Sequence, residues 1–292
     1  MVKKINPDEL QKIVASIPMI SASASRLLQI SAQPDHELMD VVNLVKTDAN
    51  LTARVLKVVN SAAYGLVSKI TSVDRAVSYL GEQVIVSIAI ENCAGELLGK
   101  ELAGYEAAGG ELWKHDLRAA IAAREVVIQS GADMSPDLAF TAGLLHDIGK
   151  ALISDYLHGT APDAVEMISS HDSLDYLAAE EQLVGVDHTV AGYALAQAWQ
   201  LPEELTAAIR YHHEPARAQE TFRPLVYAVH LGDSIAMMGG YGTGSDSMRY
   251  KLDPGYADYI QINANILANV MLTVDTEFEK LSESLSDSGE KN

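Results

Sequence analysis

Cysteine, positive charge and long apolar runs are all scarce in this sequence. A lone Cys93 among 292 residues excludes a disulfide within the chain and fits a reducing, cytoplasmic compartment. The 21 Lys and Arg are outnumbered by 40 Asp and Glu, and the net charge of −19 disfavours binding to nucleic acid or to anionic membranes. The longest apolar run, 84–90, is interrupted by Ser87 and is too short to span a bilayer. We therefore expect a cytoplasmic protein that binds neither nucleic acid nor membrane.

What remains is a composition typical of packed helices. Hydrophobic residues make up 48% of the chain and aromatic residues 6%, so Ala, Leu, Val and Ile dominate. Leu51, Val55 and Val59 recur at helical spacing after Asp48, which is a suitable N-cap, and Gly81 is placed to end a helix at 73–80. The pattern predicts an all-α fold with helices near 51–60, 73–80, 84–98, 111–130, 136–156, 161–170, 172–184, 187–200, 202–213, 223–238 and 257–285.

A change of composition near residue 105 predicts two packed helical subdomains. Glycines at 99, 104, 109 and 110 punctuate a stretch of small and acidic residues. We place the subdomains at 1–104 and 105–285, followed by a disordered acidic tail at 286–292. The glycine-rich stretch 239–244 is interpreted as a flexible loop.

Histidine and aspartate carry the chemical information in the second half of the chain. Several of them stand on separate predicted helices with apolar neighbours, where side chains face a core. Imidazole and carboxylate groups together suit borderline metals such as Fe, Mn, Co, Ni and Zn. The candidate metal ligands are His115, His146, Asp147, His188, His212, His213 and Asp233.

Asp147 and Lys150 have further roles in this interpretation. A carboxylate can bridge two metal ions, and two ions about 3.5–4 Å apart can activate water and stabilise charge on a phosphate. Side chains of adjacent residues on one helix point about 100° apart, so Asp147 can reach an ion beside the one that His146 faces. Lys150 shares their face and could hold a phosphate oxygen. Asp147 and Lys150 would be the catalytic residues if the site is active.

Each of these histidines also has a structural interpretation. A buried histidine that donates to a backbone carbonyl is commoner than a metal ligand. The His-Asp dipeptide is itself a weak signal, because Asp116 and Asp172 create two more at 115–116 and 171–172. His171 fits a solvated position at a helix end, and His36 fits a loop. His230 is interpreted as a support for Asp233.

The spacing of the histidines and aspartates resembles the HD superfamily of metal-dependent phosphohydrolases. Residues 146–150 read HDIGK, a form shared with the HD-GYP cyclic dinucleotide phosphodiesterases. A closer resemblance, to the HDOD family, is carried by DANLTARVLKVVNSAAYG at 48–65, KITSVDRAVSYLG at 69–81 and VDHTVAGYALAQAWQLP at 186–202. The opening IPMI at 17–20 also fits that family, and the resemblance covers about residues 17–238.

The resemblance implies a helical signalling module with a metal site. HDOD proteins are regarded as non-catalytic relatives of the HD enzymes, used as output or adaptor modules in bacterial signalling. Many have lost metal ligands, whereas this chain keeps the set. Carried over by position, one ion would be held by His115, His146, Asp147 and Asp233. A second ion would be held by Asp147, His188, His212 and His213.

The phosphodiesterase relatives have Gly-Tyr-Pro shortly after their paired histidines, and this chain has PARAQETF at 215–222 instead. We therefore expect a regulatory module with two divalent transition-metal ions, Fe or Mn, that binds signalling proteins or a small phosphate-containing ligand. The alternative is a metal-dependent phosphohydrolase that acts on a nucleotide or a cyclic dinucleotide.

Overall fold

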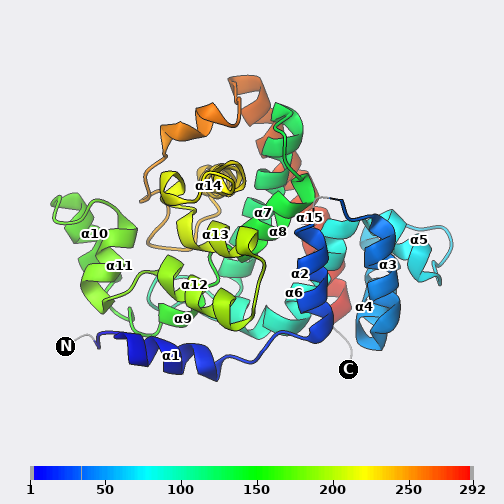
Figure 1. Ribbon diagram of the computed structural model, residues 1–292, viewed down its shortest axis with the longest axis horizontal. Helices are drawn as coiled ribbons and strands as arrows, with labels where there is room; N and C mark the ends of the chain where they lie inside the picture. The colour runs from blue at the N-terminus through cyan, green and yellow to red at the C-terminus, as the bar shows by residue number, and fades with distance from the viewer. Residues whose placement is uncertain (1–2, 34, 290–292) are drawn as a thin grey trace.

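The computed structural model describes residues 3–33 and 35–289, and every regular element within them is a helix (Figure 1). No strand occurs in these residues; an isolated antiparallel bridge joins Leu102 to Ala107. The all-α prediction is therefore confirmed. The elements of the first hundred residues are α1 (Pro7–Ser16), α2 (Ala22–Ser31), α3 (Leu38–Thr47), α4 (Ala49–Val59), η1 (Ala62–Tyr64), α5 (Val73–Leu80) and α6 (Glu82–Leu98). The later elements are α7 (Glu111–Ser130), α8 (Pro136–Leu145), α9 (Lys150–Ile153), α10 (Ala161–Ser169), α11 (Tyr176–Val184), α12 (His188–Ala198), α13 (Glu203–Tyr211), η2 (Pro215–Arg217), α14 (Arg223–Met238), η3 (Pro254–Asp258) and α15 (Ala264–Gly289).

The helix boundaries in the N-terminal part follow the local sequence signals. The Asp48 carboxylate caps α4 by accepting hydrogen bonds from the backbone N–H groups of Asn50 and Leu51 at 2.9 and 3.0 Å. Gly81 ends α5 with a φ of 80°, a conformation that favours glycine. The helices predicted at 51–60, 73–80 and 84–98 are confirmed to within two residues at each end.

The single helix predicted at 136–156 is wrong. Helix α8 ends at Leu145, residues 146–149 form turns, and α9 is a separate short helix. This turn approaches α12 closely. A Cβ atom at Gly149 would lie 1.9 Å from the carbonyl oxygen of His188, so only glycine fits there. His146 and Asp147 consequently stand on a turn that is pressed against α12.

Helix α7 is the centre of the second half, where it packs against α8, α14 and α15. It is buried on most sides, because thirteen of its side chains from Leu112 to Val127 are buried. Figure 1 shows α3, α4 and α5 at one end of the molecule and α10 and α11 at the other. The helices that carry the histidines lie between these two ends.

Both ends of the chain cross the expected boundary near residue 105. Helix α1 packs on α12, and the Ile5 N–H donates to the Val184 carbonyl at 2.6 Å. Helix α15 packs on α7 and also on α4 and η1. A hydrophobic cluster continues from Ile5 to Leu285. The division at 104/105 stays a prediction; α15 extends to Gly289, and 290–292 of the expected tail lie outside the described residues.

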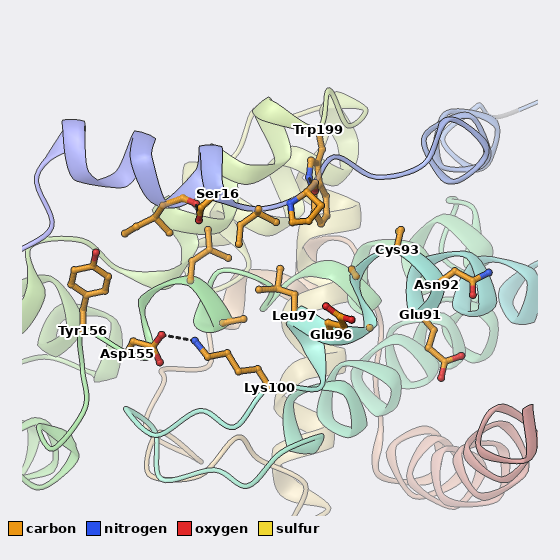
Figure 2. A pocket seen from close by; sticks show the side chains of 17 residues that line it. Ser16, Glu91, Asn92, Cys93, Glu96, Leu97, Lys100, Asp155, Tyr156 and Trp199 are labelled. Atoms are coloured by element: carbon orange, nitrogen blue, oxygen red, sulfur yellow. Dashed lines mark hydrogen bonds and ion pairs between the residues drawn. The ribbon is translucent and has the colours of Figure 1, made fainter. Parts of the chain in front are cut away.

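A cavity of about 660 Å³ lies between α1, α6, α9 and Trp199. Figure 2 shows the ion pair between Lys100 and Asp155 beside it, with Cys93 near the opposite end. Burial raises the pKa of the Cys93 thiol to about 11, so the thiolate is rare at neutral pH. The cavity lining includes no candidate metal ligand. No helix among the described residues has the length and hydropathy needed to cross a membrane.

Candidate metal centre

The seven candidate ligands come from five parts of the chain and meet in one buried place. Helix α7 supplies His115, the turn after α8 supplies His146 and Asp147, α12 begins with His188, and α14 supplies Asp233. His212 and His213 follow the last residue of α13. Their side chains are between 0% and 4% exposed. The structure therefore brings together all the residues that the sequence singled out, and their role as ligands stays a prediction.

Asp147 stands between two pairs of imidazoles. Its Oδ2 lies 3.5 Å from Nε2 of both His115 and His146. Its Oδ1 lies 3.3 Å from Nε2 of His188 and 3.4 Å from Nε2 of His212. One carboxylate oxygen thus faces each pair of nitrogens, which is the arrangement that a carboxylate bridging two ions requires.

Asp233 and His213 complete the ring of donors. Asp233 Oδ1 lies 3.2 Å from His115 Nε2, and Asp233 Oδ2 lies 3.8 Å from His213 Nδ1. Two overlapping groups have donor atoms within 4.8 Å of one another, so that each could hold a metal ion. The groups are Asp147, His188, His212 and His213, and His115, Asp116, His146 and Asp147.

Asp116 is a member of the second group that the sequence analysis discounted. Its side chain is 0% exposed, and its Oδ1 lies 3.8 Å from His146 Nδ1. Burial, reinforced by the nearby Asp147 carboxylate, raises the pKa of Asp116 well above its usual value. The His115-Asp116 dipeptide therefore contributes both residues to this region, although its sequence resembles the exposed dipeptide at 171–172.

Many polar atoms in the centre have no hydrogen-bond partner in the described part of the chain. Buried polar atoms are nearly always partnered in folded proteins, because each unsatisfied one destabilises the fold by about 1–3 kcal/mol. The unpartnered atoms are Nε2 of His115 and His146, Oδ1 of Asp147 and both ring nitrogens of His213, while Asp147 Oδ2 pairs with Lys150. They converge on one place and are nitrogen and oxygen donors, so they fit a divalent transition metal.

The other ring nitrogen of four histidines is held by the protein. A donor bond from Nδ1 fixes the tautomer and leaves the lone pair of Nε2 directed into the centre. The acceptors are the Tyr241 carbonyl for His115 (2.6 Å), the Gly143 carbonyl for His146 (2.7 Å), the Ile209 carbonyl for His212 (3.1 Å) and Glu180 Oε2 for His188 (2.8 Å).

Glu180 is a functional candidate that sequence reasoning missed. It is 0% exposed on α11, and its Oε2 also accepts the backbone N–H of His188 at 2.8 Å. The Tyr105 hydroxyl donates to Oε1 at 2.7 Å. The one local hint in the sequence was a glutamate eight residues before a histidine. This pattern is too common to be diagnostic. Glu180 orients His188 as an outer carboxylate orients a ligating histidine.

Lys150 lies at the centre, but its ammonium is already surrounded by acceptors. It is 2.5 Å from Asp147 Oδ2 and 2.5 Å from Asp246 Oδ2, and it donates to Thr243 Oγ1 at 2.8 Å. Residues 239–244 lie outside the helices, as predicted, and their flexibility stays a prediction; Thr243 is 1% exposed. Asp246, also 1% exposed, was missed because an Asp in a Gly- and Ser-rich stretch resembles a solvated loop residue.

The protonation states of four donors suit metal ligation. Burial raises the pKa of Asp147, but Lys150 and the neighbouring imidazoles hold that pKa well below its usual range. Burial also raises the pKa of Asp233, and His115 and His146 outweigh it and keep that carboxyl ionised. Ionised carboxylates are the form that binds a cation.

The two adjacent histidines are held neutral. Burial lowers the pKa of His212 to about 4, and burial together with the His212 ring holds the pKa of His213 well below its usual value. His188 differs: burial lowers its pKa, but the carboxylates of Glu180 and Asp147 outweigh burial and raise it to about 10. The His188 ring is therefore protonated at neutral pH, and a metal cation at its Nε2 would displace the proton there.

The remaining histidines lie outside the donor ring. His230 Nδ1 donates to the His212 carbonyl at 2.7 Å, and its Nε2 accepts the Asp253 N–H at 2.9 Å, so it supports the His212 backbone rather than hydrogen-bonding Asp233. His36 Nε2 lies 2.7 Å from Glu82 Oε2. Burial lowers the pKa of His36, but the Gln33 carbonyl and the Glu82 carboxylate outweigh burial and raise it.

Comparison with known proteins agrees with this arrangement. The family model described as HDOD domain matches residues 17–215. An uncharacterized protein of Treponema pallidum (strain Nichols) is 26% identical over 216 residues, which cover 74% of this chain. The match spans 41% of that protein, so this chain corresponds to less than half the length of the curated relative.

Two solved structures share the fold along nearly the whole chain. A Shewanella amazonensis SB2B protein, provisionally named a phosphohydrolase, is 24% identical with a TM-score of 0.60, and the match covers 96% of this chain and 98% of that one. A Marinobacter aquaeolei VT8 protein, provisionally named a signal transduction protein, is 19% identical with a TM-score of 0.69, covering 99% of this chain and 62% of that one. At these identities the likeness establishes the fold alone.

Proposed function

Because this chain belongs to the HDOD family, we propose that it is a cytoplasmic regulatory module of bacterial signal transduction whose buried metal centre supports a surface for signalling partners. The observation that carries the proposal is the closure of the centre. Its ligand side chains are at most 4% exposed, and the ring of Tyr250 stacks on His213 with centroids 3.7 Å apart. A metal site closed by protein on all sides is typical of a structural role, whereas catalysis needs an open ligand position.

The metal content proposed is two divalent ions, Fe or Mn, that share Asp147. The two donor groups and the position of Asp147 between them support this number. Imidazole and carboxylate donors in a mixed set support the choice of metals. When bound, such ions supply positive charge that the Asp147 and Asp233 carboxylates would balance, while the five imidazoles would act as neutral donors. The signal-transduction name of the Marinobacter protein points in the same direction.

The completeness of the donor set favours a second candidate function, a metal-dependent phosphohydrolase acting on a nucleotide or a cyclic dinucleotide. The provisional name of the Shewanella protein is consistent with it. Two observations count against it. The ammonium of Lys150 is taken by Asp246 and Thr243, and Arg217 in the segment after His213 pairs with Glu214 while its side chain is 60% exposed. Neither cation is positioned on an open site.

The test is metal analysis combined with turnover assays on protein expressed with Fe or Mn. Asp147→Ala removes the shared carboxylate, and we expect metal affinity to fall by more than about 100-fold, beyond the usual effect of an outer residue. Wild-type protein should turn over cyclic dinucleotides, nucleotides and phosphomonoesters far more slowly than about 1 s⁻¹. Circular dichroism establishes that each variant remains helical.

His171→Ala is the matched control, because His171 is exposed and lies outside the centre. It should keep its metal. Equal metal loss in the two variants would show that the centre is misassigned. Turnover near about 1 s⁻¹ that disappears in Asp147→Ala would replace the regulatory proposal by the phosphohydrolase.

A further inference from the structure

The segment 242–252 covers the metal centre without belonging to a helix. It follows α14 and leads toward η3 (Figure 1, orange). Thr243 and Asp246 are the buried residues of this segment, whereas Met248 and Leu252 are 63% and 54% exposed. Its inner face therefore touches the centre through these two polar side chains and through the Tyr250 ring, which stacks on His213, and its outer face contacts solvent.

Asp246 collects hydrogen bonds in the way that a bound anion would. The Lys150 ammonium lies 2.5 Å from Oδ2, and Oδ2 also accepts from the Tyr250 hydroxyl at 2.9 Å. Thr243 Oγ1 donates to the same carboxylate at 2.9 Å. Of the Lys and Arg side chains in 3–33 and 35–289, Lys150 is the one that pairs with Asp147, the shared carboxylate of the centre. The Asp246 carboxylate thus pairs with the Lys150 ammonium, the cation beside the centre.

Both ends of the segment are anchored on residues that support ligands. The Tyr241 carbonyl accepts from His115 Nδ1, and the Tyr241 ring stacks on the Arg118 guanidinium at 3.4 Å. At the other end the Asp253 N–H donates to His230 Nε2. Movement of the part between these anchors would therefore leave both anchor residues in place.

The main-chain links of the segment to the rest of the protein are few. The Ser245 N–H donates to the Tyr105 carbonyl at 2.7 Å, and the Arg249 carbonyl accepts from the Tyr176 N–H at 3.1 Å. A segment with few buried apolar side chains and few such bonds opens at lower free energy than the helices beneath it. Loops of this kind commonly gate a site.

We propose that residues 242–252 form an autoinhibitory lid, in which the Asp246 carboxylate holds the place on Lys150 that a phosphate-type oxyanion takes when the lid opens. The inference rests on the proposed metal centre and adds its regulation. Carboxylate and phosphate oxygens both accept charge-assisted hydrogen bonds from an ammonium group, so they compete for Lys150. The lid keeps the centre closed, and an anionic ligand opens it.

Titration calorimetry with inorganic phosphate on metal-loaded protein tests the lid. Asp246→Asn removes the competing charge with little change in volume, and phosphate should bind at least about tenfold more tightly than to wild type, a difference of about 1.4 kcal/mol. Asp155→Asn is the matched control, since it removes the Asp of the Lys100 ion pair, and its phosphate affinity should equal that of wild type. Adding Lys150→Met to Asp246→Asn should abolish the gain.

Hydrogen exchange on the wild-type protein is a second measurement that does not depend on any variant folding. Amides of 242–252 should exchange faster than those of α14, and phosphate should accelerate them further. Exchange of the segment only at the α14 rate, with or without phosphate, would overturn the lid. So would an Asp246→Asn variant that binds phosphate no better than wild type, or one whose gain survives Lys150→Met.

Metal content, measured on every sample, separates the two proposals. Wild-type protein without metal would refute the metal centre, while the exchange of 242–252 would still decide for or against the lid. Metal-loaded protein with a segment that never opens would refute the lid and leave the proposed function standing.

Discussion

Glu180 offers a sharp test of how the protein positions a candidate ligand. Its carboxylate accepts from the backbone N–H and Nδ1 of His188 and from the Tyr105 hydroxyl, all within 2.8 Å. Glu180→Ala removes the acceptor of all three hydrogen bonds at a side chain that is 0% exposed. Glu180→Gln keeps the shape, one acceptor oxygen and the packing, and it removes only the charge and one acceptor.

The two substitutions should differ strongly in stability. Each buried donor that is left without a partner costs about 1–3 kcal/mol. The Tyr105 hydroxyl can rotate to another acceptor, so the two His188 donors give about 2–6 kcal/mol for Glu180→Ala. A domain of this kind has about 5–15 kcal/mol in total, so Glu180→Ala loses a large fraction of it. In Glu180→Gln the amide oxygen can face His188 and the NH₂ group can donate to Tyr105. The loss should then be about 1 kcal/mol.

Metal affinity should respond to Glu180→Gln even though stability barely does. The carboxylate fixes His188 with Nε2 toward Asp147 and makes the ring a better donor, and outer carboxylates of this kind are worth about 10–100-fold in affinity. The assay is competition for metal with a chromophoric chelator, alongside urea denaturation of the same samples. Glu181→Gln, on the exposed side of the same helix, is the control. Equal metal affinity in the Gln variants at 180 and 181 would refute the reasoning.

Two further predictions concern the fold. Gly149→Ala should lower the free energy of unfolding by about 3 kcal/mol in urea denaturation, because its Cβ would meet the backbone of His188 and Gly192 at 1.9 and 2.5 Å. Gly95→Ala, which meets only a side chain at 3.6 Å, should be neutral or stabilising, and similar losses in both would contradict the close-approach argument. His36→Gln should destabilise the protein most below about pH 6.5, since a raised histidine pKa gives stability there that disappears as pH rises through the folded-state pKa. A loss that grows with pH in denaturation curves would contradict it.

The sequence by itself determined most of the helices and the chemical character of the centre; the helix predicted at 136–156 is two helices, and the one predicted at 257–285 begins at Ala264. Helical periodicity and caps act over one or two turns, so the cap at Asp48 and the stop at Gly81 were readable from neighbouring residues. The candidate ligands were readable because histidine and aspartate on apolar faces are uncommon and share one chemistry. Local signals of this kind do not depend on how the helices pack.

The tertiary structure decided how the chain turns at the centre. The break after Leu145 lies where Gly149 meets the backbone of α12, nearly forty residues away. Nothing in the apolar pattern of 136–156 signals it, because turns and helix continue the same spacing for a few residues. Without that contact, one helix remains the best prediction.

Only the tertiary structure also revealed which groups surround the ligands. Lys150 meets Asp246, which lies 96 residues later, and His188 meets Glu180 from another helix. Acidic and hydroxyl side chains occur throughout exposed loops, so composition cannot distinguish a buried partner from a solvated one. The difference is set by burial, which strengthens an ion pair and makes an unpaired polar group costly. Burial is a property of the packed molecule, and no short stretch of this sequence contains it.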